Sequence, residues 1–229
     1  MNQRAASILK QTELFGGLGD DVLGLLAEHA VEKHLARGEL LFLAGEKSSG
    51  LYVIAEGSLR AFRSGLDGRE QVIHVERAVT TIAEVPVFDN GAYPSSVAAE
   101  EPTRLYFIRG EHIRSVCLTH PQLALAATRL LAARLRKCAA LVESLSLQEV
   151  GQRVAKLLLD AASSKGKATP DGIAFDQTLT HSQLAARIGT VREVVTRSLA
   201  RLQDQGLVIL DGKRVIIPDE ASLRSYFEG

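Results

Sequence analysis

The sequence lacks most of the features that mark secreted, membrane-spanning or metal-binding proteins. Its 229 residues contain only two cysteines, Cys117 and Cys138, which form neither a metal-binding spacing nor a disulfide framework. No apolar run approaches the ~20 residues that a membrane-spanning helix needs. The N-terminal stretch MNQRAASILK has no signal-peptide core. We therefore expect a cytoplasmic protein that has no membrane partner and no metal site.

The chain also has no net charge, because 27 basic residues balance 27 acidic ones. A neutral chain is a poor candidate for a protein that coats nucleic acid indiscriminately, whereas a local basic helix on a neutral body suits a sequence-specific binder. No internal repeat or low-complexity tract is present. The length allows one large domain or two small ones.

The first half of the chain changes from a helical to a strand pattern. Residues 5–33 carry apolar clusters at helical spacing, interrupted by glycines, and predict short helices at the edge of a domain. Over about 36–109, short apolar bursts alternate with glycine turns such as Asp67-Gly68, which predicts a β-sandwich or barrel-like roll. The predicted strands are Leu40–Phe42, Leu51–Ile54, Leu59–Phe62, Val72–Val75, Val97–Ala98 and Leu105–Ile108.

A long helix is predicted next, from about Pro121 to Leu147. Five of its residues step by 4, 3, 4 and 3, which is the heptad pattern of paired helices, and we expect this seam to form a homodimer. The alternative is packing within one subunit. The seam consists of Leu131, Leu135, Cys138, Val142 and Leu145. The helix is interrupted near Leu145–Glu149, a new helix runs over 149–162, and the loop-forming residues 163–172 follow.

The most informative stretch is Leu179–Val208, where two helical patterns flank Gly189. Thr180 or Ser182 can cap the first helix, and Gly189 can end it in the left-handed conformation. Such a pair, joined by a short turn with glycine, predicts a helix-turn-helix. The hairpin that follows, with Asp211-Gly212 at its turn, makes the whole a winged helix.

The polar face of the second helix predicts DNA binding. Arg192, Glu193 and Arg197 project away from its valines. Arginine can bind guanine through two hydrogen bonds, and glutamate can accept one from cytosine. An ordinary solvated face is the alternative. Lys213 and Arg214 lie at the wing, where they either contact phosphate or are simply exposed.

Taken together, these motifs resemble the CRP/FNR superfamily of bacterial transcription regulators. The resemblance rests on GEKSSGLYVIAEGSLRAF, LDGREQVI, the long helix and REVVTRSLARLQDQGLV, and covers nearly the whole chain. It implies an α+β fold in three parts: a cyclic-nucleotide-binding-like β-roll (jelly roll) with N-terminal helices over 1–120, a dimerisation helix over 121–148, and a winged helix over 149–229. It also implies a palindromic DNA site and, for an activator, RNA polymerase as a partner.

By this resemblance, Arg192, Glu193 and Arg197 match the family's base-reading residues and suggest a half-site of the TGTGA or TTGA type. Val191 departs from the small polar residue common at its position, and it could contact a thymine methyl group. The remaining matched positions usually hold phosphates at a helix N-terminus, and they are Thr180, His181 and Ser182.

The resemblance also locates an effector pocket between the β-roll and the long helix, but several positions depart from the cyclic-AMP pattern. A glycine-glutamate pair becomes Ala83-Glu84, and an arginine-serine pair becomes Pro94-Ser95, followed by Ser96. Proline offers neither charge nor N–H to a buried phosphate. The positions that touch adenine fall near Cys138 and Ala139, beside Leu135. These departures weigh against cyclic AMP.

The resemblance raises two possible cofactors, an iron–sulfur centre and haem. The N-terminal cysteine cluster of iron–sulfur relatives is absent, so we expect no iron–sulfur centre. Haem stays an alternative, because Ala83-Glu84 and the missing arginine are similar to haem-dependent nitric-oxide or carbon-monoxide sensors. Its candidate ligands are His74, His112, His120, Cys117 and Cys138.

The sequence thus predicts a homodimeric transcription regulator that is not an enzyme. An effector in the pocket would shift a two-state equilibrium, with Leu145–Glu149 as the hinge. Two other classes remain as rivals. A cupin-like enzyme would need clustered metal ligands on adjacent strands, where His74 stands alone. A pure interaction module would have a helix-turn-helix that no longer binds DNA.

Overall fold

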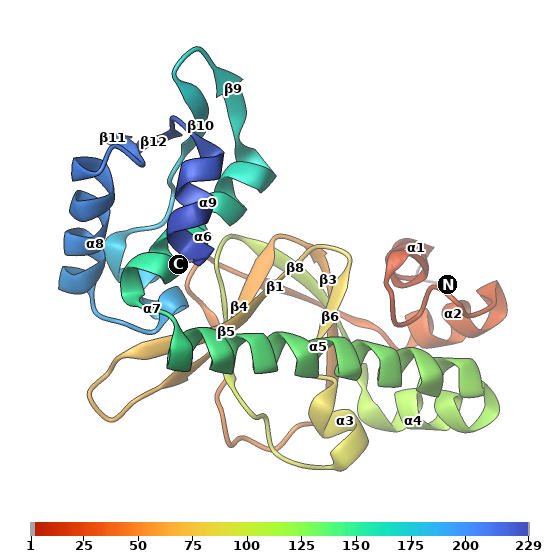
Figure 1. The fold of residues 1–229 in the computed structure, drawn as a ribbon. Helices are drawn as coiled ribbons and strands as arrows, with labels where there is room; N and C mark the ends of the chain where they lie inside the picture. The colour runs from red at the N-terminus through yellow and green to blue at the C-terminus, as the bar shows by residue number, and fades with distance from the viewer. Residues whose placement is uncertain (1–2, 229) are drawn as a thin grey trace. The chain divides into compact units, whose positions relative to one another are not determined.

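The computed structural model describes residues 3–228 and divides them into two compact units (Figure 1). The first unit consists of the described residues up to Arg63 together with Ile73–Ala139. The second consists of Ser64–Val72 together with the described residues from Ala140 onward. Across residues 3–228, no helix has both the length and the apolar character required to cross a membrane.

Two four-stranded sheets form the β-roll. The first has the strand order β1-β8-β3-β6 and the second the order β2-β7-β4-β5. The strands are β1 (Val31–Leu35), β2 (Leu40–Phe42), β3 (Gly50–Glu56), β4 (Ser58–Ser64), β5 (Glu70–Arg77), β6 (Thr80–Ile82), β7 (Ser96–Ala99) and β8 (Thr103–Arg109). All six predicted strands are present, and the predicted turn at Asp67-Gly68 joins β4 to β5, with Gly68 at a φ of 77°.

Strand β3 is buried on both faces because it lies between two cores. Alternate side chains of a strand point to opposite faces. Leu51 and Val53 therefore join a core with the N-terminal helices, and Tyr52 and Ile54 join the core between the two sheets. This double burial explains why its sequence is almost continuously apolar.

Five helices accompany the β-roll. They are α1 (Gln3–Gln11), α2 (Asp20–Glu28), α3 (Val85–Asp89), α4 (Gly110–Thr119) and the long α5 (Pro121–Leu147). The predicted N-terminal helices are confirmed, but the helical reading of 31–33 is wrong. Val31 begins β1 and pairs with Phe107 of β8, so pairing between distant segments overrides the local helical pattern.

The predicted break after α5 is confirmed. A new helix, α6 (Val150–Lys165), begins at a capping box formed by Glu149 and Gln152. Arg153 closes the end of α5, because its Nη1 donates hydrogen bonds to the carbonyls of Ser144 (3.2 Å) and Gln148 (2.8 Å). The carbonyl groups that a helix leaves unpaired at its C-terminus are thus partly satisfied from the next helix.

The second unit contains the predicted winged helix with a larger sheet than expected. Its further elements are β9 (Lys167–Thr169), β10 (Gly172–Asp176), α7 (His181–Ile188), α8 (Arg192–Asp204), β11 (Ile209–Asp211), β12 (Arg214–Ile217) and α9 (Glu220–Glu228). The wing is not an isolated two-stranded hairpin, because β12 also pairs with β10 in a sheet ordered β11-β12-β10-β9. The predicted loop 163–172 contains the end of α6 and β9.

Candidate nucleic-acid interface and effector site

The turn between α7 and α8 is fixed by local chemistry at both ends of α7. The Thr180 hydroxyl accepts a hydrogen bond from the Gln183 amide (3.3 Å), while the Gln183 side chain accepts one from the Thr180 amide (2.9 Å). Gly189 ends the helix at a φ of 70°, and the amides of Gly189 and Thr190 both bond to the Ala185 carbonyl. This reciprocal cap and left-handed glycine set the crossing of the two helices.

The inner face of α8 holds the pair together. Val195, Leu199 and Leu202 are buried in one core with Leu184 and Ile188 of α7. At 3.6 residues per turn, these α8 positions lie on one side of the helix. The opposite side must therefore face away from the core.

That opposite side carries Glu193 and Arg197, two of the three predicted base-reading residues. Arg192 lies in line with the buried stripe and is the first residue of α8. Arg192, Glu193 and Arg197 are all exposed, and Arg201 lies one turn beyond Arg197. Glu193 and Arg197 are four residues apart and so lie on one face. Val191 is half-buried as the N-cap residue of α8 and makes no side-chain cap. The three polar residues are thus all exposed within the first two turns of α8.

The residues predicted to bind phosphate at the start of α7 differ in their exposure and in their hydrogen bonds. Thr180 is exposed, but its hydroxyl is committed to the cap. Ser182 is exposed on the first turn. His181 is half-buried, and its Nδ1 bonds to the Thr196 hydroxyl (2.8 Å), a contact between α7 and α8 that the sequence did not indicate.

The wing presents its basic residues to solvent. Gly212 adopts a φ of 58° in the turn between β11 and β12, and Lys213 and Arg214 follow it with exposed side chains. The Lys213 carbonyl accepts a hydrogen bond from the Gln177 amide (2.7 Å), which ties the turn to the segment before α7. A backbone hydrogen bond therefore links the wing turn to the segment that leads into the helix pair.

At the predicted effector site, the dominant feature is a buried ion pair within the first unit. Glu84 is fully buried and is held by the guanidinium of Arg134 on α5. The Nη2 of Arg134 lies 3.1 Å from a Glu84 oxygen and donates to the Thr81 carbonyl (2.6 Å). A second carboxylate, Glu76 of β5, lies 3.6 Å from the same guanidinium. We call these residues the Arg134 cluster.

The polar interior continues to His74. Its Nε2 is buried without a hydrogen-bond partner among the described residues, as is the Nε of Arg134. Burial, followed by the positive charges of Arg134 and Lys137, lowers the pKa of His74 to about 4, so the ring is neutral at pH 7. Burial also raises the pKa of Glu76, although Arg134 and Lys137 act in the opposite direction.

The other predicted pocket residues in the β-roll are not members of the Arg134 cluster. Ala83 is buried at a φ of 72°, next to Glu84. The Ser96 hydroxyl accepts a hydrogen bond from the Ala44 amide (3.0 Å), so it is committed within the β-roll. Pro94 is exposed, and its carbonyl accepts a bond from Arg63 (3.1 Å). Ser95 is half-buried.

Arg134 and Glu76 could not be identified as site residues from the sequence. The pattern of α5 contains several arginines, and nothing in their spacing distinguishes the one that turns inward. The predicted neighbours Leu135 and Cys138 instead lie exposed on the single chain.

Comparison with known proteins assigns this chain to a family. A cyclic nucleotide-binding domain model matches residues 32–120, and a Crp-like helix-turn-helix domain model matches residues 152–226. The chain is 30% identical to the "Cyclic AMP receptor protein" of Thermus thermophilus, covering 96% of this chain and 99% of the relative. The protein belongs to the CRP/FNR family of transcription regulators.

Other relatives agree with this assignment. A "CRP-like cAMP-activated global transcriptional regulator" of Mycobacterium tuberculosis is 29% identical over 94% of this chain and 96% of its own length. A solved structure of a CRP/FNR-family regulator from Eubacterium rectale, 22% identical, has the same fold, with a TM-score of 0.78 over 96% of this chain and 100% of that one. The protein is thus a transcription regulator with a DNA-binding helix-turn-helix, and the cupin-like enzyme is set aside.

In this CRP/FNR regulator, most of the predicted dimer seam is exposed on the single chain. Leu135 and Val142 are 71% and 63% exposed, Cys138 and Leu145 are also exposed, and Leu131 is half-buried. Leucine and valine side chains with this exposure leave apolar surface uncovered on α5.

Of the other candidate haem ligands, Cys138 is exposed, and His112, His120 and Cys117 are half-buried. The His112 ring stacks on His29, with centroids 3.9 Å apart. The Nδ1 of His120 lies 2.9 Å from the Thr119 hydroxyl. Cys117 is half-buried, and burial raises the pKa of its thiol.

Proposed function

We propose that this CRP/FNR regulator is a homodimer that reads a palindromic DNA site, and that an effector near the Arg134 cluster controls its DNA affinity. The observation that carries the proposal is the exposure of Arg192, Glu193 and Arg197 in the first two turns of α8, a helix with one buried face. Arginine at a guanine edge and glutamate at cytosine N4 would read a half-site of the TGTGA or TTGA type. Val191 would contact a thymine methyl group.

Further contacts would fix the register on the duplex. The exposed Ser182, Lys213 and Arg214 would bind phosphates from the start of α7 and from the wing. His181, joined to Thr196, and Thr180, joined to Gln183, would present the α7 N-terminus to a phosphate. RNA polymerase is a further partner if the protein is an activator.

The uncovered apolar surface of α5 supports the dimer. Two copies of α5 that pair through Leu135, Val142 and Leu145 would bury side chains that solvent contacts in the single chain. A two-fold dimer presents two α8 helices to two inverted half-sites about 34 Å apart, one turn of DNA. The proposed symmetry of the protein and that of its site thus correspond.

We also propose that the effector is not cyclic AMP, although the names of the Thermus and Mycobacterium relatives refer to that nucleotide. Three features support this. Glu84 is engaged by Arg134, the Ser96 hydroxyl is committed to Ala44, and Pro94 offers no N–H to a phosphate. Haem remains the second candidate, because the buried, neutral His74 has an Nε2 without a partner among the described residues.

A binding titration tests the DNA proposal. Fluorescence anisotropy would compare a duplex bearing TGTGA and its inverted repeat with a scrambled duplex, at fixed salt. Arg192→Ala should lose about 1–3 kcal/mol of specificity per half-site. Arg224→Ala, an exposed arginine paired with Glu220 on α9, is the matched control and should change nothing. Equal affinity of the wild type for both duplexes would favour the pure interaction module.

Calorimetry and absorbance test the effector proposal. Titration of cyclic AMP into the full chain should give no saturable heat, and micromolar binding would contradict the proposal. An absorbance spectrum after haem supplementation would separate the two remaining cases. A Soret band that His74→Ala removes selects haem, whereas no band leaves a small metabolite.

A further inference from the structure

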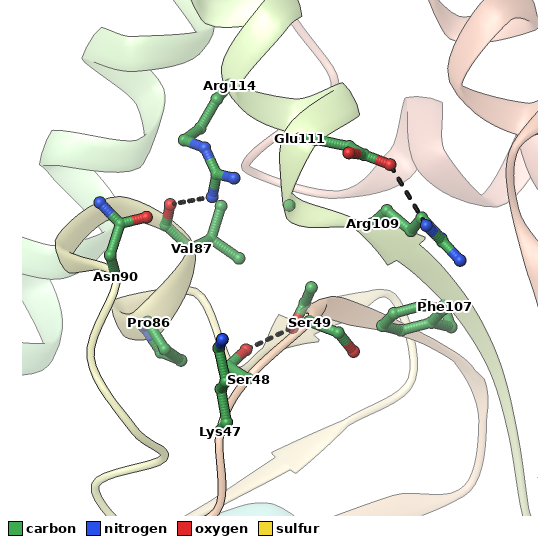
Figure 2. A pocket seen from close by; sticks show the side chains of 12 residues that line it. Lys47, Ser48, Ser49, Pro86, Val87, Asn90, Phe107, Arg109, Glu111 and Arg114 are labelled. Carbon is green, nitrogen blue, oxygen red and sulfur yellow. Dashed lines mark hydrogen bonds and ion pairs between the residues drawn. The ribbon is translucent and has the colours of Figure 1, made fainter.

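A hollow of the first unit lies where α4 begins, and Figure 2 shows the side chains that line it. Its volume is about 580 Å³, and small-molecule sites commonly measure roughly 300–1,000 Å³. Its walls come from the turn before β3, from α3, from the end of β8 and from the start of α4. None of its lining residues belongs to the Arg134 cluster.

The charged residues of this hollow are mostly positive. Lys47, Arg109 and Arg114 line it, against the single carboxylate of Glu111. Arg109 and Glu111 form an exposed pair at 3.4 Å, which solvent weakens. Lys47 is exposed and has no ion-pair partner within residues 3–228. One cation at the rim is therefore available to an incoming anion.

The inner wall is held in place by hydrogen bonds. Arg114 donates from Nη1 to the Val87 carbonyl (2.9 Å), and in Figure 2 its guanidinium points toward α3. The Gly110 amide donates to the Ser49 carbonyl (2.9 Å), which ties the first residue of α4 to the turn before β3. No side chain caps α4, so the positive end of its dipole adds to the three basic groups.

The remaining wall is apolar. Phe107, Pro86 and Val87 line the hollow alongside the basic groups. An apolar wall next to a few charged groups is the usual composition of a site for an organic molecule. The hollow thus combines surface for an apolar body with charge for an anionic group.

We propose that this hollow binds a small organic anion. Its phosphate or carboxylate group contacts Lys47 and Arg109, and its apolar body lies against Phe107 and Pro86. The site is separate from the effector pocket and does not depend on DNA binding. The proposal can therefore fail while the proposed function holds, and the reverse is also true.

Calorimetry of the full chain with three naphthalene probes tests the proposal. The probes are 1-naphthyl phosphate, 1-naphthoate and the neutral 1-naphthol. Lys47→Ala removes the unpaired cation from an exposed position and should not affect folding. Gly110→Ala places a Cβ 3.0 Å from the Arg114 Nη1, inside the hollow. Arg37→Ala, an exposed arginine elsewhere in the same unit, is the control.

We expect at least one anion to bind about tenfold more tightly than 1-naphthol, and the better anion distinguishes phosphate from carboxylate recognition. Lys47→Ala should weaken that binding about three- to tenfold, Gly110→Ala should also weaken it, and Arg37→Ala should leave it unchanged. The methyl NMR signals of Val87 should shift with the bound anion. No anion binding at about 5 mM, equal binding of 1-naphthol, or equal affinities of Lys47→Ala and Arg37→Ala would overturn the proposal.

Discussion

At the scale of single residues, the Arg134–Glu84 pair is a buried contact whose loss should destabilise the first unit. Glu84 is fully buried, so removal of its partner would leave a carboxylate without compensation. We expect Arg134→Ala to lower the free energy of unfolding by about 3 kcal/mol, because breaking a buried pair costs far more than breaking an exposed one. Urea denaturation would measure this change.

The matched control is Arg136→Ala, an exposed arginine two positions along the same helix. Its effect should stay within about 0.5 kcal/mol. If Arg134→Ala cost no more than this control, the pair would not be a structural element of the site.

The lowered pKa of His74 makes the stability of the first unit decrease as the pH falls. Its folded pKa of about 4 lies below the unfolded value of about 6.5, so the unfolded state binds more protons between these values. This contribution to stability is complete above pH 6.5 and is lost as the pH falls toward 4. Since the side chain is not fully buried, we expect a loss of about 1–2 kcal/mol.

Glu76 acts in the opposite direction, because its raised pKa favours the folded state as the pH falls. The His74 contribution must therefore be obtained as a difference. Unfolding free energies of the wild type and His74→Gln, measured from pH 4 to 7, should converge as the pH falls. Parallel curves would show that His74 is not protected from protonation.

Residues on a repeating pattern could be predicted from the sequence, whereas isolated ones could not. The placement of Glu193 and Arg197 follows from the apolar period of α8, which leaves the side opposite Val195, Leu199 and Leu202 exposed. Arg134 has no such guide. Its role depends on β5 and β6, which are distant in the chain, so only the folded structure identifies its partners.

At the scale of elements, alanine substitutions at two glycines distinguish the cost of backbone strain from the cost of steric crowding. Gly189 and Gly206 both adopt positive φ, 70° and 72°, after α7 and α8. A Cβ at Gly206 would meet nothing within 4 Å, whereas at Gly189 it would collide with Leu145 and Gln71. Gly206→Ala should therefore cost about 1 kcal/mol from strain alone. Gly189→Ala should cost at least as much, because the atoms it meets are the ends of two flexible side chains that must also move.

Thermal unfolding of the two variants would test this order. Equal shifts in Tm would mean that the neighbours of Gly189 move aside at little cost. A larger shift for Gly206→Ala would contradict the described geometry of the helix-turn-helix.

The ten-residue helix α4 (Gly110–Thr119) was not predicted, and the other elements that the sequence missed are short. β6 and β9 have three residues each and α3 has five, so none contains a full period of apolar residues. Their formation depends on partners, as β6 pairs with Tyr52–Ile54 of β3. The long α5 and the capped α7 carry their signals locally, which is why they were predicted correctly.

At the scale of the whole molecule, the proposed dimer and the proposed palindromic DNA site make linked predictions. Val142→Glu would place a charge in the proposed seam, where an apolar partner side chain would face it. Sedimentation should show a shift from dimer to monomer, and DNA affinity should fall with it. Leu118→Glu, at a fully exposed leucine of α4, should alter neither. If Val142→Glu lost DNA binding but remained dimeric, the proposed dimer interface on α5 would be contradicted.

The most direct test of the account is a selection of bound duplexes from a random pool by the full chain. The protein should enrich two inverted half-sites of the TGTGA or TTGA type with centres one helical turn, about 10 base pairs, apart. Arg192→Ala should relax the sequence at the guanine position and keep the spacing. A pool without an enriched motif, or one enriched in a single motif without its inverted repeat, would contradict a dimeric reader.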